Sequence, residues 1–445
     1  MRVSPARTAA FEILLRGERD RAYASELLHS SGLSTLSVRD HGLATELVMG
    51  VLRWRSVVDE QLASASAQKL ARLDPEVLTT LRIGAYQLLF LSRVPSRAAI
   101  FESVEIVKKA RKRSAAAFVN AVLRKISTRA PVDAMVEIEK GADEAALAKT
   151  AAHPEWLVAR WIARYGRDIA RQICIYDQTV PSAAIHVPDE RAVENLQRKS
   201  ISLSPGLLVS SARRVSSSDA VHARALTQGQ ISIQDEASQL VALLVGRGGK
   251  ILDCCAAPGG KTSLIAERNP GAKVYACDLY PHRARLLRRL TQRQNVQIAA
   301  ADALALPFTA RFDRILADVP CSGTGTLAHN PEIKWRLTPD DLLDLQARQM
   351  AILKSALAAL SGGGRLVYST CSLEPEENEM VVKSVLDGTD DFRLIDCRGS
   401  LEDLQRAGEL SWNDVNSLVS GPYLRTIPGV HPCDGFFAAI LERKG

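Results

Sequence analysis

Apolar residues recur at helical spacing through the first third of the chain. In the stretch "DPEVLTTLRIGAYQLLFL", Leu81, Ala85 and Leu88 follow one another at intervals of three or four residues. This is the period of an α-helix with one buried face. Asp74 can cap this helix, and Pro75 suits its first turn.

The same amphipathic pattern returns at 96–113 and at 115–126, so we predict an all-helical domain over residues 1–130. Residues 131–152 are small, polar and weakly patterned, and they are expected to form a linker with one short helix. Structure restarts at His153 with a helix that ends at Gly166, followed by the short strand-like runs "SAAIHVP" and "GLLVSS". Residues 153–228 therefore predict a small α+β module.

The pattern changes again from about residue 230. The runs "ILDCCAA", "KVYACD", "VQIAAAD", "FDRILADVP" and "GRLVYSTCS" have the length of buried strands, and helical segments separate them. Alternating strands and helices predict an α/β domain with a parallel sheet covered on both faces, here over residues 229–445. Ligands bind such a sheet at the carboxyl ends of its strands.

Composition narrows the class of protein. A chain of 445 residues with 46% hydrophobic and 24% charged residues is expected to form several globular domains. No apolar run approaches the length of a membrane span, and the N-terminus lacks the pattern of a secretory signal. The eight cysteines include no CxxC pair, so we expect neither a disulfide framework nor a metal site. The expected compartment is a reducing cytosol, that is, a cytoplasmic location.

Positive charge is concentrated at the start of the chain. The net charge is +7, and residues 1–130 hold 21 Lys and Arg against 12 Asp and Glu. A basic module on a near-neutral body suggests a polyanionic partner, nucleic acid first. The densest patch, and the candidate RNA-binding site, is Lys108, Lys109, Arg111, Lys112 and Arg113. The alternative is a solvated helix face without a partner.

A glycine turn follows the first strand of the α/β domain in "LDCCAAPGGKT". The end of a nucleotide P-loop would fit Gly260 and Lys261, but Cys255 stands where that motif needs glycine. A dinucleotide fingerprint needs three spaced glycines, and only Gly259 and Gly260 are present. The third possibility is the turn of an S-adenosylmethionine site, and the fourth is a tight turn without a ligand.

Acidic residues at the ends of the next strands favour the S-adenosylmethionine site. Asp278 ends "KVYACD" and is placed to hold ribose hydroxyls, and Asp302 ends the third strand, where it could meet the adenine. With Asp318, three successive strands end in aspartate. A turn without a ligand would not need this set.

Two thiols also lie at strand ends. Cys321 follows Asp318 in "DVPCSGTG", and Cys371 lies in "YSTCS". Methylation of carbon 5 of cytosine requires a thiolate that adds to carbon 6, a group that hydrogen-bonds ring nitrogen 3, and a methyl donor. This chemistry leaves open which thiol attacks. We expect Cys254, Cys255 and Cys277 to be small buried hydrophobes.

Together, "CCAAPGGKT", "DVPCSGTG" with the following "NPEIKW", and "YSTCSLEPEENE" resemble the RNA 5-methylcytosine methyltransferases of the Sun and Fmu group. The resemblance implies a Rossmann-like class I methyltransferase domain that closes with the strand "DGFFAAIL". It assigns attack to Cys371, release of the methylated RNA to Cys321, and contact with the base to Asp318. It also implies that S-adenosylmethionine touches Cys255, Ala256, Ala257, Pro258, Gly259, Gly260, Lys261, Asp278, Arg283, Asp302 and Asp318.

The N-terminal third, with "LRIGAYQLLFL" and "FVNAVLRKI", resembles the NusB-like RNA-binding domain. This combination is typical of the RsmB branch of the family, which implies a cytosine in small-subunit (16S) ribosomal RNA as the target. We expect the protein to be a monomer. The loop "TLAHNPEIKW" varies the family pattern and could touch RNA. The alternatives are the same chemistry on transfer RNA, a non-catalytic RNA-binding factor, and a nicotinamide-dependent oxidoreductase.

Overall fold

The computed structural model describes residues 3–20, 23–28, 36–132, 138, 143–187, 189–215, 231–309 and 311–445. The chain forms two compact units. The first contains residues 1–179 together with 327–336, and the second contains residues 180–326 and 337–445. The predicted boundaries at 130, 152 and 228 stay predictions, since much of 131–142 and all of 216–230 lie outside the described residues.

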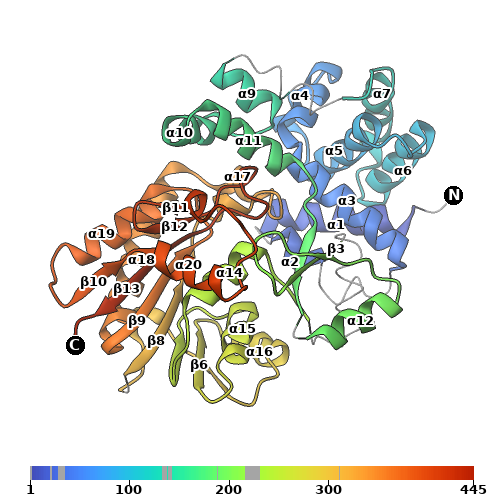
Figure 1. The fold of residues 1–445 in the computed structure, drawn as a ribbon. Helices are drawn as coiled ribbons and strands as arrows, with labels where there is room; N and C mark the ends of the chain where they lie inside the picture. Colours follow the sequence, from blue (N-terminus) through green and yellow to red (C-terminus); the bar gives the residue numbers. More distant parts are fainter. Residues whose placement is uncertain are drawn as a thin grey trace. The chain divides into compact units, whose positions relative to one another are not determined.

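The first unit is helical where it is described, and the sequence pattern predicts this for residues 1–130 (Figure 1). Short 3-10 turns at Leu70–Arg72 and Arg113–Ala115 interrupt its α-helices. The α-helices are α1 (Pro5–Asp20), α2 (Ala24–Leu28), α3 (Val38–Arg53), α4 (Arg55–Ala65), α5 (Pro75–Phe90), α6 (Ser96–Lys109), α7 (Ala116–Ile126), α9 (Glu144–Thr150), α10 (Glu155–Tyr165), α11 (Arg167–Gln178) and α17 (Ile333–Arg336).

Helix α5 shows how the predicted pattern becomes a core. It begins at Pro75, and Leu81, Ala85 and Leu89 on it are fully or almost fully buried. The expected side-chain cap is absent, because Asp74 makes no capping hydrogen bond. The carboxylate of Asp74 instead lies 2.8 Å from the ammonium of Lys112.

Residues 327–336, here called the inserted segment, come from the middle of the second unit's sequence but pack within the first. The guanidinium of Arg53 donates to the carbonyl oxygen of Ala328 at 2.9 Å. The indole of Trp335 donates to the carbonyl oxygen of Leu52 at 2.6 Å, and Glu332 accepts from the amide of Ala24 at 2.9 Å. Lys334 is 1% exposed. The loop "TLAHNPEIKW" was proposed from the sequence as a contact for RNA, but two of its charged side chains, Glu332 and Lys334, are buried in the helical unit.

The second unit begins with a small antiparallel sheet of order β2-β3-β1-β4. Its elements are β1 (Ala183–His186), α12 (Glu190–Arg198), β2 (Ser204–Pro205), β3 (Ala212–Val215) and β4 (Ser232–Ile233). The strand predicted at "GLLVSS" is wrong. The amides of Leu208 and Val209 donate to the buried carboxylate of Glu236 at 2.6 and 3.1 Å, rather than to a neighbouring strand.

The larger sheet has the strand order β11-β12-β13-β9-β8-β5-β6-β7, with β10 paired to β13. Its strands are β5 (Lys250–Asp253), β6 (Lys273–Asp278), β7 (Val296–Ala300), β8 (Phe312–Asp318), β9 (Leu360–Thr370), β10 (Phe392–Ile395), β11 (Val419–Ser420), β12 (Tyr423–Arg425) and β13 (Phe437–Arg443). Strands β5 to β9 pair in parallel, as predicted. Strand β13 runs antiparallel to β9, so the complete sheet is mixed.

Helices cover both faces of this sheet (Figure 1). Alternate residues of one strand enter different clusters, since Leu316 packs with one face and Ile315 with the other. One face packs on α14 (Glu236–Leu244), α15 (Gly260–Arg268) and α20 (Cys397–Arg406). The other packs on α18 (Pro339–Ala358) and α19 (Glu379–Leu386). Helix α16 (Pro281–Leu290) connects β6 to β7.

Candidate active site

The glycine turn joins β5 to α15, as its position in the sequence predicts. Gly259 has φ +115°, and a Cβ there would lie 2.4 Å from the hydroxyl of Thr291. Only glycine fits both the backbone angle and the space. Below the turn, the hydroxyl of Thr262 donates to Asp253 at 2.7 Å. Burial raises the pKa of Asp253 to about 7, against the effect of that hydrogen bond.

The acidic residue at the end of β6 is connected to this turn. Asp278 is 4% exposed, and Arg283 lies 3.7 Å from its carboxylate. The same guanidinium donates to the carbonyl oxygen of Ala257 at 3.3 Å. Arg283 therefore links the turn to the end of the second strand. Asp302 lies beyond β7 and caps a short 3-10 helix by accepting from the amide of Leu304 at 2.9 Å.

The two candidate catalytic thiols are neighbours. The sulfur atoms of Cys321 and Cys371 lie 3.3 Å apart, although 50 positions separate the residues. Gly325 holds the two loops together, because its amide donates to the carbonyl oxygen of Cys371 at 2.9 Å. A Cβ at Gly325 would lie 2.1 Å from the carbonyl oxygen of Gly435. The junction between the two loops therefore has no room for a side chain at position 325.

A charged pair lies beside the thiols. The ammonium of Lys261 donates to one carboxylate oxygen of Asp318 at 2.7 Å, and the hydroxyl of Ser369 donates to the other at 2.7 Å. The ammonium also lies 5.0 Å from the ring centre of Phe436. Lys261 comes from the glycine turn, so this pair connects the predicted cofactor residues to the predicted catalytic ones.

The surroundings of Cys321 and of Lys261 shift the pKa of each group. The hydrogen bond with Cys371 and, secondly, burial raise the pKa of Cys321 well above its usual value. Cys321 is therefore a protonated thiol at neutral pH. Burial lowers the pKa of Lys261, but the charge and hydrogen bond of Asp318 outweigh that effect and raise it, with a further contribution from Cys371.

The remaining cysteines are buried or half-buried. Cys254 and Cys277 are at most 1% exposed, as expected, whereas Cys255 is half-buried in the turn. Burial raises the pKa of each of these three thiols. All three therefore stay protonated at neutral pH. Cys174, Cys397 and Cys433 are buried.

The basic patch at the end of α6 and the following turn, Lys108 to Arg113, is mostly exposed. Arg111 has φ +62°. Two members of the patch have acidic partners, since Lys108 lies 2.7 Å from Glu105 and Lys112 lies 2.8 Å from Asp74. Lys109, Arg111 and Arg113 have exposed side chains and so carry the charge available to a partner.

Sequence reasoning missed several polar residues around this site. Asp253 supports the turn through Thr262. Glu377 is fully buried and accepts hydrogen bonds from Ser322 and Ser372, which follow the two thiols in sequence. The sequence did contain an indication of Glu377, because this residue belongs to the same "YSTCSLEPEENE" stretch as Cys371.

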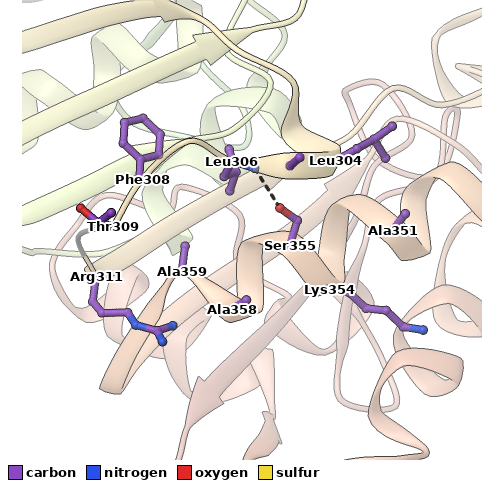
Figure 2. Close-up of a pocket in the computed structure, with 11 residues that line it drawn as sticks. Leu304, Leu306, Phe308, Thr309, Arg311, Ala351, Lys354, Ser355, Ala358 and Ala359 are labelled. Atoms are coloured by element: carbon purple, nitrogen blue, oxygen red, sulfur yellow. Dashed lines mark hydrogen bonds between the residues drawn. The ribbon is translucent and has the colours of Figure 1, made fainter.

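A hollow of about 600 Å³ lies between α18 and the segment that includes residues 304–309 and Arg311 (Figure 2). Its lining includes Phe308, Arg311 and Lys354, and at its edge the amide of Leu306 donates to the hydroxyl of Ser355 at 3.3 Å. Neither thiol lines this hollow. The candidate chemistry therefore lies elsewhere in the same unit.

Within the described ranges, no group of three or more His, Cys, Asp or Glu could hold a metal ion. No helix in the part of the chain that the structure describes is long and apolar enough to cross a membrane.

A glycine turn, acidic strand ends and this strand order define a Rossmann-like methyltransferase domain, here in one chain with a helical domain. Comparisons with known proteins agree. The family described as 16S rRNA methyltransferase RsmB/F matches residues 241–442, and the NusB family matches residues 4–128.

Relatives match over nearly the whole chain. The chain is 33% identical to the probable ribosomal RNA small subunit methyltransferase B of Bacillus subtilis, over 100% of both chains. It is 31% identical to ribosomal RNA small subunit methyltransferase B of Vibrio cholerae, over 91% of this chain and 90% of the relative. The chain belongs to the RsmB/Sun family of small-subunit ribosomal RNA methyltransferases, so it is an RNA methyltransferase.

Solved structures share the fold. The crystal structure of PH0851 aligns over 99% of both chains with a TM-score of 0.79 and 21% identity. A methyltransferase homologue from Pyrococcus horikoshii aligns over 70% of this chain and 99% of its own, with a TM-score of 0.54 and 26% identity. NSun6 from the same organism, solved with SFG, covers 66% of this chain and 98% of its own, with a TM-score of 0.53 and 19% identity.

Proposed function

We propose that this protein methylates carbon 5 of a cytosine in small-subunit (16S) ribosomal RNA, through a covalent bond between Cys371 and the base. The observation that carries the proposal is the pair of thiols 3.3 Å apart beside the Asp318–Lys261 pair. Binding RNA alone would require neither thiol. The relatives named as ribosomal RNA small subunit methyltransferase B support the choice of RNA.

S-adenosylmethionine is the proposed methyl donor, and the turn suits it chemically. Asp278 offers a buried carboxylate that can accept from ribose hydroxyls. One carboxylate oxygen of Asp253 and the side-chain oxygen of Gln234 are buried without a hydrogen-bond partner among the described residues. Acceptors of this kind fit a ligand with a cationic amino group. We propose that the cofactor contacts residues 255–261, Asp278, Arg283, Asp302 and Asp318, as the family resemblance implies.

In the proposed reaction, different residues of the chain carry out different steps. The target base must leave its stack before a thiol can reach its ring, which costs a few kcal/mol. The Cys371 thiolate then adds to carbon 6, and ring nitrogen 3 takes up a proton that it shares with Asp318, so the added electron pair does not leave the ring as a free anion. The electron pair of the ring becomes available at carbon 5, where S-adenosylmethionine supplies the methyl group. A base removes the carbon 5 proton, and the bond between sulfur and carbon 6 breaks.

Cys321 is the proposed releasing group. Its raised pKa keeps it a thiol, so it can donate a hydrogen bond to Cys371 and meet the sulfur as it leaves the base. Asp318 is held from both sides by Lys261 and Ser369, which fixes the direction of its carboxylate. The basic patch of the helical unit would supply phosphate contacts. We further propose that the enzyme acts as a cytoplasmic monomer.

Replacing each thiol separately with alanine tests the assignment. With RNA and S-adenosylmethionine present, Cys321→Ala should accumulate protein linked to RNA on denaturing gels, because attack still occurs and release fails. Cys371→Ala should give no linked species and no methylation. The reverse pattern would exchange the two roles. Bisulfite sequencing of total RNA from a deletion strain then distinguishes ribosomal from transfer RNA as the substrate.

A further inference from the structure

Glu377 is a buried carboxylate between the two thiol loops. It ends the short 3-10 helix Pro375–Glu377, and its side chain is fully buried. Four donor groups reach its two oxygens: the amide and hydroxyl of Ser322, the hydroxyl of Ser372 and the amide group of Gln349. A buried carboxylate with this many donors is strongly oriented.

The donors are the immediate neighbours of the thiols. Ser322 follows Cys321, and Ser372 follows Cys371. The hydroxyls of both serines donate to the same carboxylate oxygen, and the two hydroxyl oxygens lie 3.1 Å apart. One carboxylate oxygen thus ties together the two residues next to the sulfur atoms.

Gln349 of α18 holds the other side of the Cys321 loop. Its side-chain nitrogen donates to Glu377 at 2.9 Å and to the carbonyl oxygen of Pro320 at 2.9 Å. Cys321 therefore lies between two residues, Pro320 and Ser322, that belong to one hydrogen-bond network. The backbone of Glu377 is held as well, because the hydroxyl of Tyr368 donates to its carbonyl oxygen at 2.6 Å.

We propose that Glu377 is a positioning residue that sets the separation of the two thiols through Ser322 and Ser372. This inference rests on the proposed function, in which one thiol attacks and the other releases. For Cys321 to assist as Cys371 leaves the base, the two sulfur atoms must stay within contact distance through the reaction. Glu377 does not need to touch substrate or cofactor for this role.

The test is the rate at which the two thiols form a disulfide. Diamide takes up the two electrons and two protons lost as the two sulfhydryl groups become one disulfide bond. Peptide mapping by mass spectrometry, after alkylation of free thiols, measures the Cys321–Cys371 product. In Glu377→Ala this rate should fall by about tenfold or more, because the loops lose their shared acceptor. Glu377→Gln keeps one acceptor oxygen, so the rate should fall by roughly threefold.

Glu402→Gln is the matched control, because it makes the same chemical change at an exposed position on α20. Its rate should stay within about twofold of the wild type. Gln349→Leu is a second variant for the case that Glu377→Ala fails to fold. It keeps the carboxylate but removes one donor, so the rate of disulfide formation should also fall. Wild-type oxidation rates in folded Glu377 and Gln349 variants would overturn the inference.

This measurement needs neither RNA nor methyl transfer, so it separates the two proposals. If the Glu377 variants oxidise more slowly than the wild type while Cys321→Ala forms no link to RNA, the positioning role stands and the proposed chemistry fails. In the active enzyme, Glu377→Gln should also raise the fraction of protein linked to RNA, because release suffers more than attack. Calorimetric binding of S-adenosylmethionine should be unchanged.

Discussion

Lys261 and Asp318 form the charged contact on which the cofactor turn and the thiol site meet. The pair is partly buried, with 14% and 25% of the two side chains exposed. A charge left without its partner in such a place is costly. The pair therefore holds both residues in one arrangement, and either residue should depend on the other.

Replacing Lys261 with methionine should lower the turnover number on the order of 100-fold, equivalent to about 2.7 kcal/mol, because Asp318 loses the group that orients it. Steady-state methylation with saturating RNA measures this. Lys383→Met on α19, at an exposed position, is the control. A turnover number for Lys261→Met close to that of the control would mean that Ser369 alone orients Asp318.

Single residues could be predicted from the sequence only where their neighbours in the chain form a recognisable pattern. The glycine turn, the aspartates and both thiols could be predicted because each follows a recognisable strand. The role of Glu377 could not, because its contacts with Ser322 span 55 positions and exist only once the two loops are folded. The choice of Cys371 over Cys321 came from family resemblance, not from spacing.

Among elements, the strands β5 to β9 and the helices between them follow their predicted order. Apolar runs of strand length separated by amphipathic helices carry that information locally. Two features did not follow. The antiparallel direction of β13 depends on its pairing with β9. The absence of a strand at "GLLVSS" goes with the hydrogen bond that Glu236 accepts there. Both depend on residues far away in sequence.

Lys334 in the inserted segment should make the free energy of unfolding depend on pH. Burial lowers the pKa of Lys334 to about 7, and Arg53 adds to the decrease while Asp177 opposes it. The unfolded chain keeps an ordinary lysine pKa of about 10.4, so between these values the unfolded state binds a proton that the native state lacks. Stability should therefore rise with pH from about 7 to about 10.

Lys334→Met should remove this dependence. The variant should exceed the wild type in free energy of unfolding at pH 7, and the difference should shrink by on the order of 2 kcal/mol by pH 9.5. Denaturant unfolding of the full chain, followed by tryptophan fluorescence, measures it. Lys109→Met makes the same change at an exposed site and should show a constant difference. A constant difference for Lys334→Met as well would contradict the lowered pKa.

Across the whole molecule, charge is unevenly divided, with the positive excess in residues 1–130. The structure narrows the candidate patch, because acidic partners neutralise Lys108 and Lys112. Lys109, Arg111 and Arg113 remain as the exposed cations at the end of α6. Composition could indicate a polyanionic partner, but only the folded chain shows which charges are paired.

Changing Lys109, Arg111 and Arg113 together to alanine should weaken RNA binding and reduce its salt dependence by roughly 0.7 to 0.9 of a slope unit per lost phosphate contact. Titrations at several salt concentrations measure the slope. Arg191→Ala with Arg198→Ala on α12 removes exposed charge from the other unit and serves as the control. Equal slopes for the triple variant and the wild type would favour a solvated face.

The inserted segment also bears on how the chain folds during synthesis. The helical unit has nearly all its sequence once Thr179 is made, but Trp335 and Lys334 come from roughly 150 residues later. At translation rates of about 5–20 residues per second, this interval is on the order of 10 s. During that time Arg53 lacks the carbonyl of Ala328, and the place that Lys334 will occupy is open. The nascent helical unit therefore stays incomplete until residues 327–336 have been synthesised.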